Sequence, residues 1–262
     1  MNRKKLFPFT AVVAQEKLKL ALILNVINPG IGGVLISGEK GTAKSTLVRG
    51  LAQLLSDMSV IEVPLNITED RLVGTLKLTD TLKDGMRHIE YGILHNADGQ
   101  FLYIDEVNLL SAHISNIIAE VASRGENIIE RDGISFCHRC RFIPVGTMNP
   151  EEGFLRPQLL DKFGLFASAF GEQNISMRSE IVSRYLKYEK NPIEYYLKFA
   201  DKEKLLFERI SAARSRLPDV KITDENLGLA ALISHNAGCE GNRCEIILIE
   251  AARALAAWND EG

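Results

Sequence analysis

The segment GGVLISGEKGTAKSTL, residues 32–47, decides how the first part of the chain is expected to fold. It begins with a short apolar run bounded by glycines, which predicts a buried strand ending at Ser37. Apolar residues then recur at helical spacing from Leu47 to Leu55, so we expect a helix to begin near Lys44. A glycine-rich turn therefore joins a buried strand to the N-terminus of a helix.

This turn differs at one position from the phosphate-binding pattern G-x-x-x-x-G-K-[ST], because Ala43 replaces the second glycine. In such a loop, backbone N–H groups and the helix N-terminus surround a triphosphate, while the lysine and the hydroxyl meet the outer phosphates and magnesium. We expect the methyl group of Ala43 to be tolerated, since a negative φ is expected one residue before a helix, whereas Gly41 is free to adopt a positive φ. A glycine-rich turn without a ligand is the alternative. The residues expected to bind nucleotide are Gly38, Glu39, Lys40, Gly41, Thr42, Ala43, Lys44, Ser45 and Thr46.

A second apolar strand, QFLYIDE at residues 100–106, ends in two carboxylates. An acidic pair at a strand tip supplies what ATP hydrolysis requires: a ligand for Mg²⁺ and a group that activates water. Asp105 is expected to hold the metal through water, with Ser45 as a further metal ligand, and Glu106 to polarise the attacking water. The alternative is an acidic cap on the next helix, which the phosphate loop upstream makes less favourable.

Strands and helices alternate up to about residue 170, which is typical of an α/β domain with a mostly parallel sheet. We expect a helix that ends at Gly125, and Asp132-Gly133 predicts the turn of a β-hairpin. RFIPVGTMNP, residues 141–150, is expected to form a third strand, with Pro144 at a sheet edge or bulge because proline cannot donate to a ladder. From about residue 180 to 258 the pattern predicts a smaller helical domain.

Two further polar residues are candidates for the same site. Asn149 follows the third strand, where its amide could position water near the γ-phosphate, although Asn-Pro is also a common turn. Arg243 opens the last helix, where the helix dipole disfavours a cation by ~0.3–1 kcal/mol. A phosphate nearby would offset that cost, and pairing with Glu240 or Glu245 is the alternative.

Composition narrows the class of protein. The 262 residues carry a formal net charge of -3, so no global positive field favours nucleic acid or an anionic membrane as a partner. The apolar run at residues 20–27 is interrupted by Asn25, so we expect neither a signal peptide nor a membrane span, and a cytoplasmic location. The C-x-x-C formed by Cys137 and Cys140, and the looser pair Cys239 and Cys244, indicate either a zinc or redox site or free thiols.

With these residues in place, the chain resembles the ATPase subunit of magnesium chelatase, a member of the AAA+ superfamily, and the relatives that serve cobalt chelatase. The resemblance is carried by residues 7–46, 68–78, 92–110, 145–165 and 250–257. It implies an α/β AAA+ P-loop NTPase core over 1–175 and a smaller C-terminal helical lid over 176–262. It also implies a homo-oligomeric ring, usually a hexamer, that uses ATP and Mg²⁺ to drive a partner chelatase subunit, which inserts a magnesium or cobalt ion into a tetrapyrrole.

The resemblance assigns roles to individual residues. Asn149 falls on sensor 1 and Arg243 on sensor 2, Lys162 stands where the family places an arginine finger that reaches into a neighbour's site, and residues 68–88 correspond to an insertion in the second helix. The Asp-Gly hairpin corresponds to the presensor hairpin. The Walker A and Walker B motifs correspond to Gly38, Gly41, Lys44, Ser45 and Thr46, and to Asp105 and Glu106.

Four departures from the family pattern bear on activity. Ala43 and Ala14 replace glycines, the latter in the segment near the adenine. Lys162 keeps the charge of the finger but lacks the planar fork of arginine, which is expected to weaken stabilisation across the subunit boundary unless Arg156 compensates. The chain also ends after one terminal helix, where relatives continue, so the lid is short or the chain is truncated. A nucleotide-gated assembly module with little hydrolysis, and a MoxR-type chaperone of another metalloenzyme, remain the alternative functions.

Overall fold

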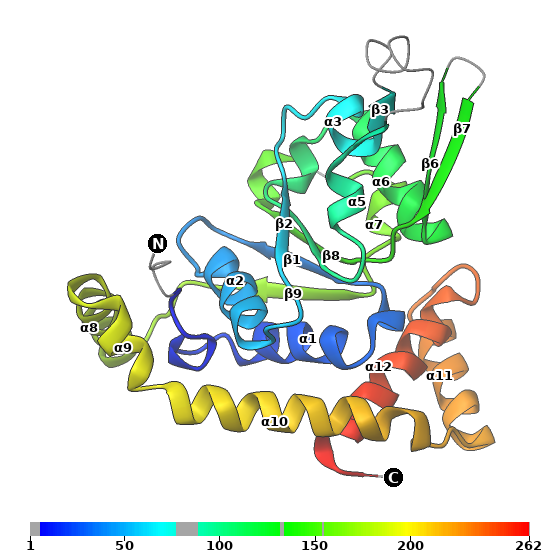
Figure 1. Cartoon of the computed structure of the whole chain (residues 1–262). Coiled ribbons are helices and arrows are strands. Elements are labelled where there is room, and N and C mark those ends of the chain that lie inside the picture. The colour runs from blue at the N-terminus through cyan, green and yellow to red at the C-terminus, as the bar shows by residue number, and fades with distance from the viewer. Residues whose placement is uncertain (1–5, 77–88, 132–133, 154, 262) are drawn as a thin grey trace.

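A five-stranded parallel sheet lies at the centre of the computed structural model, which describes residues 6–76, 89–131, 134–153 and 155–261. The strand order is β2-β5-β8-β1-β9, and the predicted α/β class is confirmed (Figure 1). Because all five strands run parallel, their carboxyl ends meet at one edge of the sheet. The strands are β1 (Val34–Gly38), β2 (Val60–Val63), β5 (Phe101–Ile104), β8 (Ile143–Met148) and β9 (Leu165–Ala169).

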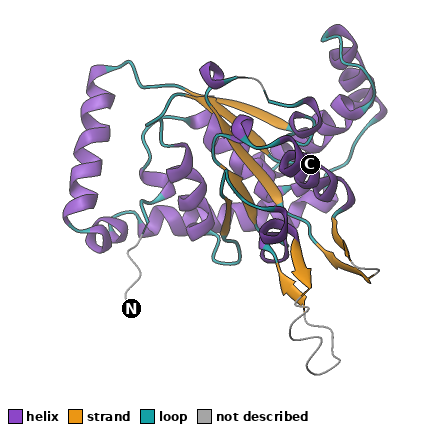
Figure 2. Cartoon of the chain, turned by 90° about the horizontal axis from the view of Figure 1, so that it is seen from above, coloured by secondary structure: helices purple, strands orange, loops and turns teal. Residues whose placement is uncertain are grey.

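Both faces of the sheet are buried, as the continuous apolar runs of its strands predict. Val34 and Ile36 pack on one face with helices α1 (Glu16–Ile27), α2 (Lys44–Leu54), α10 (Ala200–Arg216) and α12 (Arg243–Asn259). Leu35, between them in β1, packs on the other face with α3 (Glu69–Val73), α5 (Ile93–Asn96) and α6 (Ala112–Arg124). Figure 2 shows helices on both sides of the strands. The period-2 direction of the side chains thus divides one strand between two cores.

The expectation that Pro144 lies at an edge or bulge is wrong, because it lies in β8 between β5 and β1. Ile143 donates to Gln100 of the β5 side, so the nitrogen of the next residue faces β1, which pairs with β8 only from Val34 opposite Val145 onward. The nitrogen of Pro144, which has no hydrogen to donate, therefore faces residues that precede the first paired residue of β1. Gly33 provides the space: a Cβ there would lie 2.5 Å from Cγ of Pro144.

The two smaller strand pairs lie outside the main sheet. Strand β6 (Glu126–Arg131) pairs antiparallel with β7 (Ile134–Arg139), as a hairpin requires, while the predicted turn residues Asp132 and Gly133 lie outside the described residues. Gly125 ends α6 in a left-handed conformation, which confirms the predicted helix end. The predicted insertion begins with α3 and β3 (Gly74–Leu76), which pairs with β4 (Ile89–Tyr91); its residues 77–88 also lie outside the described part.

The C-terminal part is helical from Ile175 onward, as predicted. It comprises α8 (Ile175–Lys190), α9 (Pro192–Leu197), α10, α11 (Asp224–Asn236) and α12. Helices α10 and α12 contribute Ile210 and Ala254 to the core beneath α1, and α10 runs along α1 in Figure 1. The remaining elements are the four-residue α-helix α7 (Pro157–Leu160) and short 3-10 turns. These turns are η1 (Phe9–Ala11), η2 (Pro29–Ile31), η3 (Val107–Leu109), η4 (Pro150–Glu152) and η5 (Leu217–Asp219).

Across the described residues, the helices are too short or too polar to cross a bilayer.

Candidate nucleotide site

The loop between β1 and α2 is built as the sequence predicts, except at one residue. Strand β1 ends at Gly38, α2 begins at Lys44, and Gly41 has the expected positive φ of 84°. The expected negative φ at Ala43 is wrong, because this residue caps α2 with φ 62° and ψ 19°. The left-handed conformation costs an L-residue with a Cβ about 1–2 kcal/mol, so the position calls for glycine. Ala14, at the other substituted glycine, has φ 58° and is left-handed as well.

Lys44 lies over the loop from the first turn of α2. Its ammonium group donates to the carbonyl of Gly38 and, at 3.0 Å, to that of Glu39. Partial burial lowers the pKa of Lys44, while the carboxylates of Asp105 and Glu106 act in the opposite direction. The lysine thus binds neutral carbonyls in a place where anionic oxygens would be stronger partners.

The acidic tip of β5 is held by hydroxyl groups from two strands. Tyr103 donates to Oδ1 of Asp105 at 3.1 Å, and Thr147 of β8 donates to the same oxygen. Burial, together with the Asp105 carboxylate, raises the pKa of Tyr103, so its phenol remains a donor. Thr147 also accepts from the backbone N–H of Glu106 at 3.1 Å. These bonds fix the position of the Asp105 carboxylate.

Glu106 is in turn bound by a lysine of the loop. Nζ of Lys40 lies 2.9 Å from Oε1 of Glu106 and 3.4 Å from Oε1 of Glu152 in η4. The hydrogen bond to Glu106 is the main cause that raises the pKa of Lys40. Glu106 itself has φ 51° and is the N-cap residue of η3, but its side chain makes no capping hydrogen bond. The alternative that the acidic pair caps a helix therefore holds for the backbone of Glu106 and not for its carboxylate. The loop and both polar strand ends are therefore joined by one ammonium group.

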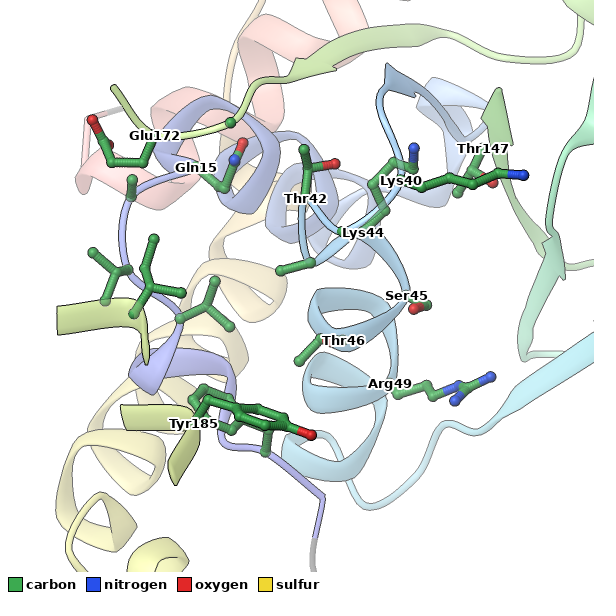
Figure 3. A pocket seen from close by; sticks show the side chains of 18 of the residues that line it. Gln15, Lys40, Thr42, Lys44, Ser45, Thr46, Arg49, Thr147, Glu172 and Tyr185 are labelled. Carbon is green, nitrogen blue, oxygen red and sulfur yellow. The ribbon is translucent and has the colours of Figure 1, made fainter. Parts of the chain in front are cut away.

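A cavity of about 910 Å³ lies above this carboxyl edge of the sheet. One end is polar and contains Lys40, Lys44, Ser45 and Thr147, which Figure 3 shows on one side of the site. The other end is apolar and lies between the N-terminal segment and α8, where Tyr185 is seen in Figure 3. The apolar wall is formed by Phe7, Val12, Val13, Ala14, Ile181, Val182, Tyr185 and Tyr188.

Contacts between distant segments hold the apolar end together. Arg184 of α8 donates to the carbonyl of Ala11 at 2.8 Å, and Gln15 donates to the carbonyl of Phe170 at 2.7 Å. Phe7 packs edge-on against Tyr188, with ring centroids 5.2 Å apart. An apolar chamber that opens into a polar one matches a nucleotide, which has a flat base at one end and phosphates at the other.

The structure brings most of the predicted site residues to this cavity. Residues 40–46, Asp105, Glu106 and Asn149 line it, whereas Gly38 and Glu39 are not among the lining residues and accept hydrogen bonds from Lys44 through their carbonyls. The side chain of Asn149 accepts from the N–H of Glu151 and so caps η4. Its position beside the polar end follows from its place after β8 at the carboxyl edge of the sheet.

Arg243 and Lys162 are not among the lining residues. They flank Asp161, whose two oxygens each lie 3.5 Å from one cation. The partner of Arg243 is thus Asp161 rather than its sequence neighbours Glu240 or Glu245, which corrects that alternative. A Cβ on Gly32 would lie 3.4 Å from the carbonyl of Lys162 and 3.7 Å from Nη2 of Arg243, so both residues lie at the start of β1. The phosphate loop lies at its other end.

Several site residues were missed by sequence reasoning. Glu152 and Tyr103 contact the predicted residues directly. Tyr103 carries a weak signal, because it precedes Asp105 by two positions in a strand and so shares its face. The apolar wall from α8 carries none, since no local pattern indicates that a helix of the C-terminal part returns to the loop.

The four cysteines are free thiols. Cys140 is buried and donates to the carbonyl of Leu94 at 3.0 Å, while the exposed Cys137 lies beside Glu126 on the hairpin. Among the described residues, no group of three or more histidine, cysteine, aspartate or glutamate side chains is arranged to hold a metal ion. Within the part of the chain that the structure describes, Cys137 and Cys140 therefore have no further ligands that would complete a zinc site.

Comparison with known proteins identifies the family. The model of the AAA domain of the dynein-related subfamily matches residues 33–163. A protein of Methanocaldococcus jannaschii described as a magnesium-chelatase subunit ChlI homolog is 43% identical over an alignment of 295 positions, which covers 99% of this chain and 81% of that protein. The chain belongs to the magnesium-chelatase ATPase-subunit family.

Other members of the magnesium-chelatase family agree along nearly the whole chain. The magnesium-chelatase 38 kDa subunit of Rhodobacter capsulatus is 39% identical over an alignment of 286 positions, which covers 97% of this chain and 82% of that subunit. A structure of the complex between subunits BchI and BchD of magnesium chelatase matches with a TM-score of 0.61 and 34% identity, covering 97% of this chain and 96% of that chain. As a member of this AAA family, the chain is an ATPase.

Proposed function

We propose that the chain is the ATPase motor of a metal chelatase. It binds Mg·ATP in the cavity above the sheet, hydrolyses it, and powers the insertion of magnesium or cobalt into a tetrapyrrole by partner chelatase subunits. The observation that best supports this is the cavity itself, because its apolar end fits a base while the loop at residues 40–46 and the acidic tip of β5 form its polar end. The metal insertion takes place on the partner.

The oxygen ligands of the site fit Mg²⁺. The Ser45 hydroxyl and the Asp105 carboxylate line the same cavity, and hard oxygen donors are the ligands that Mg²⁺ prefers. Both hydroxyls that bind Asp105 use Oδ1; within the described residues Oδ2 accepts no hydrogen bond, so it remains available. When bound there, the ion supplies positive charge that offsets the charge of the β- and γ-phosphate oxygens.

The remaining polar residues then have distinct tasks. Lys44 exchanges its loop carbonyls for phosphate oxygens, and the N-terminus of α2 faces the same charge. Glu106 polarises the attacking water, and the amide of Asn149 helps to orient it. We infer that these three side chains act on a nucleotide bound by their own subunit, since all of them line one cavity.

Lys162 and Arg243 act on the nucleotide of a neighbouring subunit. A five-residue strand spans about 17 Å, and both cations lie at the end of β1 that is remote from the loop. That separation supports a ring in which each subunit completes the site of the next, as the hexamer expected from the family would.

The decisive measurement is ATP turnover by the unmodified chain and by Glu106→Gln. Loss of the activating carboxylate is expected to lower kcat about 100-fold or more while ATP binding is retained. Glu120→Gln on α6, an exposed carboxylate paired with Arg124, serves as the matched control and should leave kcat unchanged. Equal turnover by the unmodified chain and Glu106→Gln would remove Glu106 from this role.

The metal and the partner are tested by reconstitution. The chain is mixed with candidate chelatase partner subunits, Mg·ATP and a tetrapyrrole, and metal insertion is followed by absorbance with magnesium in one arm and added cobalt in the other. Insertion in one arm that stops when Glu106→Gln replaces the unmodified chain identifies the metal. Insertion that proceeds equally without the chain contradicts the motor role.

A further inference from the structure

One ammonium group binds two carboxylates across the polar end of the cavity. Lys40 is the third residue of the phosphate loop, and it lies 2.9 Å from Glu106 and 3.4 Å from Glu152. Its own side chain is 73% exposed, whereas those of Glu106 and Glu152 are 25% and 28% exposed. The two carboxylates are therefore largely shielded from water, and the lysine is the exposed member of the cluster.

The backbone around these carboxylates leaves their side chains dependent on the lysine. The Glu106 backbone is held by its N–H bond to Thr147, so Lys40 decides where its carboxylate lies. In Glu152, Oε2 is buried and lacks a hydrogen-bond partner among the described residues, while Oε1 contacts Lys40. A buried carboxylate oxygen without a donor is costly, so Glu152 competes for cations at this end of the cavity.

We propose that Lys40 is a positioning residue: it holds Glu106 and Glu152 in the nucleotide-free chain and moves to the terminal phosphate of bound ATP, which releases Glu106 to bind the attacking water. This rests on the proposed function, because it requires ATP in this cavity. The exchange would make the water-activating group available only when a triphosphate is present. ADP lacks the terminal phosphate and would leave Lys40 on the carboxylates.

The charges of the site favour this exchange. Lys40 lines the cavity together with Lys44 and Ser45, which are the residues proposed to meet the outer phosphates. A terminal phosphate offers several anionic oxygens, and charge-assisted bonds to phosphate are among the stronger hydrogen bonds in proteins. The lysine itself is largely in water, so its movement needs little dehydration, and its bonds to the terminal phosphate offset the loss of its contacts with the two carboxylates.

The test measures Mg²⁺-dependent binding of a non-hydrolysable ATP analogue and of ADP, together with kcat/KM for ATP, for Lys40→Met and Lys40→Arg. Lys40→Met is expected to weaken analogue binding about tenfold, to change ADP binding less than about twofold, and to lower kcat/KM about tenfold, since it loses a contact made only with the triphosphate. Lys40→Arg keeps the cation and should restore both analogue affinity and kcat/KM to within about threefold. Lys204→Met, from an ion pair of similar exposure on α10, is the control and should change neither.

A double-mutant cycle tests the exchange itself. Glu152→Gln removes a competitor for Lys40, so it should tighten analogue binding about threefold in the unmodified background and less than about 1.5-fold in Lys40→Met. Equal gains in both backgrounds, or an equal loss of ADP and analogue binding in Lys40→Met, would overturn the inference while leaving the ATPase proposal intact. Absence of any ATP binding by the unmodified chain would overturn both.

Discussion

At the scale of single residues, the loop shows how a sequence motif can be right about position and wrong about conformation. The pattern located Lys44 and Ser45, because their spacing from Gly38 is fixed by the strand, the turn and the helix start. It did not reveal that Ala43 is left-handed, since φ is set by how the loop closes onto α2 rather than by neighbouring residue types. The general pattern has glycine at the position of Ala43, and the left-handed backbone there explains why glycine is suited to it.

Replacing Ala43 by glycine should stabilise the chain. With φ 62°, the alanine bears a conformational cost that glycine avoids, so Ala43→Gly is expected to raise the free energy of unfolding by about 1 kcal/mol. Ala252→Gly, at an exposed position inside α12, should instead lower it by about 1 kcal/mol. Urea denaturation of the three proteins checks both signs, and a loss of stability in Ala43→Gly would contradict the left-handed conformation.

Side-chain partners at the site were less predictable than the site itself. Asp105 and Glu106 could be placed because both follow an apolar strand, and parallel strands end at one edge of a sheet. The contact between Lys40 and Glu152 could not, because it joins segments 112 residues apart whose approach depends on strand order. Sequence pattern thus fixes which strand end a group occupies, and strand order decides which group it meets.

At the scale of elements, strand order also explains the error at Pro144. The rule that excludes proline from central strands assumes neighbours on both sides, but the β1 ladder begins one residue later. A residue near the start of a central strand can therefore behave as an edge residue on one side. Only the register of β1 against β8 could show this, and register is a tertiary property.

The contact between α10 and η1 predicts a pH dependence of stability. Glu203 is 4% exposed and accepts from both the N–H and the hydroxyl of Thr10, at 2.8 and 2.6 Å. Burial raises the pKa of Glu203. At pH values between the pKa of the unfolded chain and that of the folded chain, the folded chain therefore keeps a proton that the unfolded chain has released. Its contribution to stability is therefore present below the ordinary glutamate pKa and is lost as the pH rises through the folded value.

Glu203→Gln should remove this dependence. The amide oxygen still accepts from Thr10, and the uncharged group avoids burying a carboxylate whose Oε2 has no hydrogen-bond partner among the described residues. We expect the variant to gain about 1 kcal/mol relative to the unmodified chain at pH 7, and the gain to shrink towards pH 4. Urea midpoints measured from pH 4 to 8 test this, and a constant difference across that range would contradict it.

At the scale of the whole molecule, the helical part has two separate relations to the sheet. Helix α8 forms the apolar wall of the cavity, whereas α10 and α12 pack beneath α1 and place Arg243 near the start of β1. The sequence predicted the helices and the opening of the last one at Arg243, because both follow local patterns. Their docking depends on long-range packing, so the division of the chain at residues 175 and 176 remains a prediction.

The remote position of Lys162 and Arg243 leads to a test of shared sites. Glu106→Gln should be inactive because its own site lacks the activating group, and the double variant Lys162→Ala/Arg243→Ala because it cannot complete the site of its neighbour. In an equal mixture, about a quarter of the interfaces join two intact halves if subunits assemble at random in a ring. ATP turnover should therefore recover to about a quarter of the unmodified rate.

A mixture of Glu106→Gln with Asp105→Asn, both defective in the same half of the site, is the control and should stay inactive. Failure of the first mixture to recover, with both variants still assembling, would show that the two cations do not act across subunits, and the geometry around Asp161 would then have to be explained by a role within one chain.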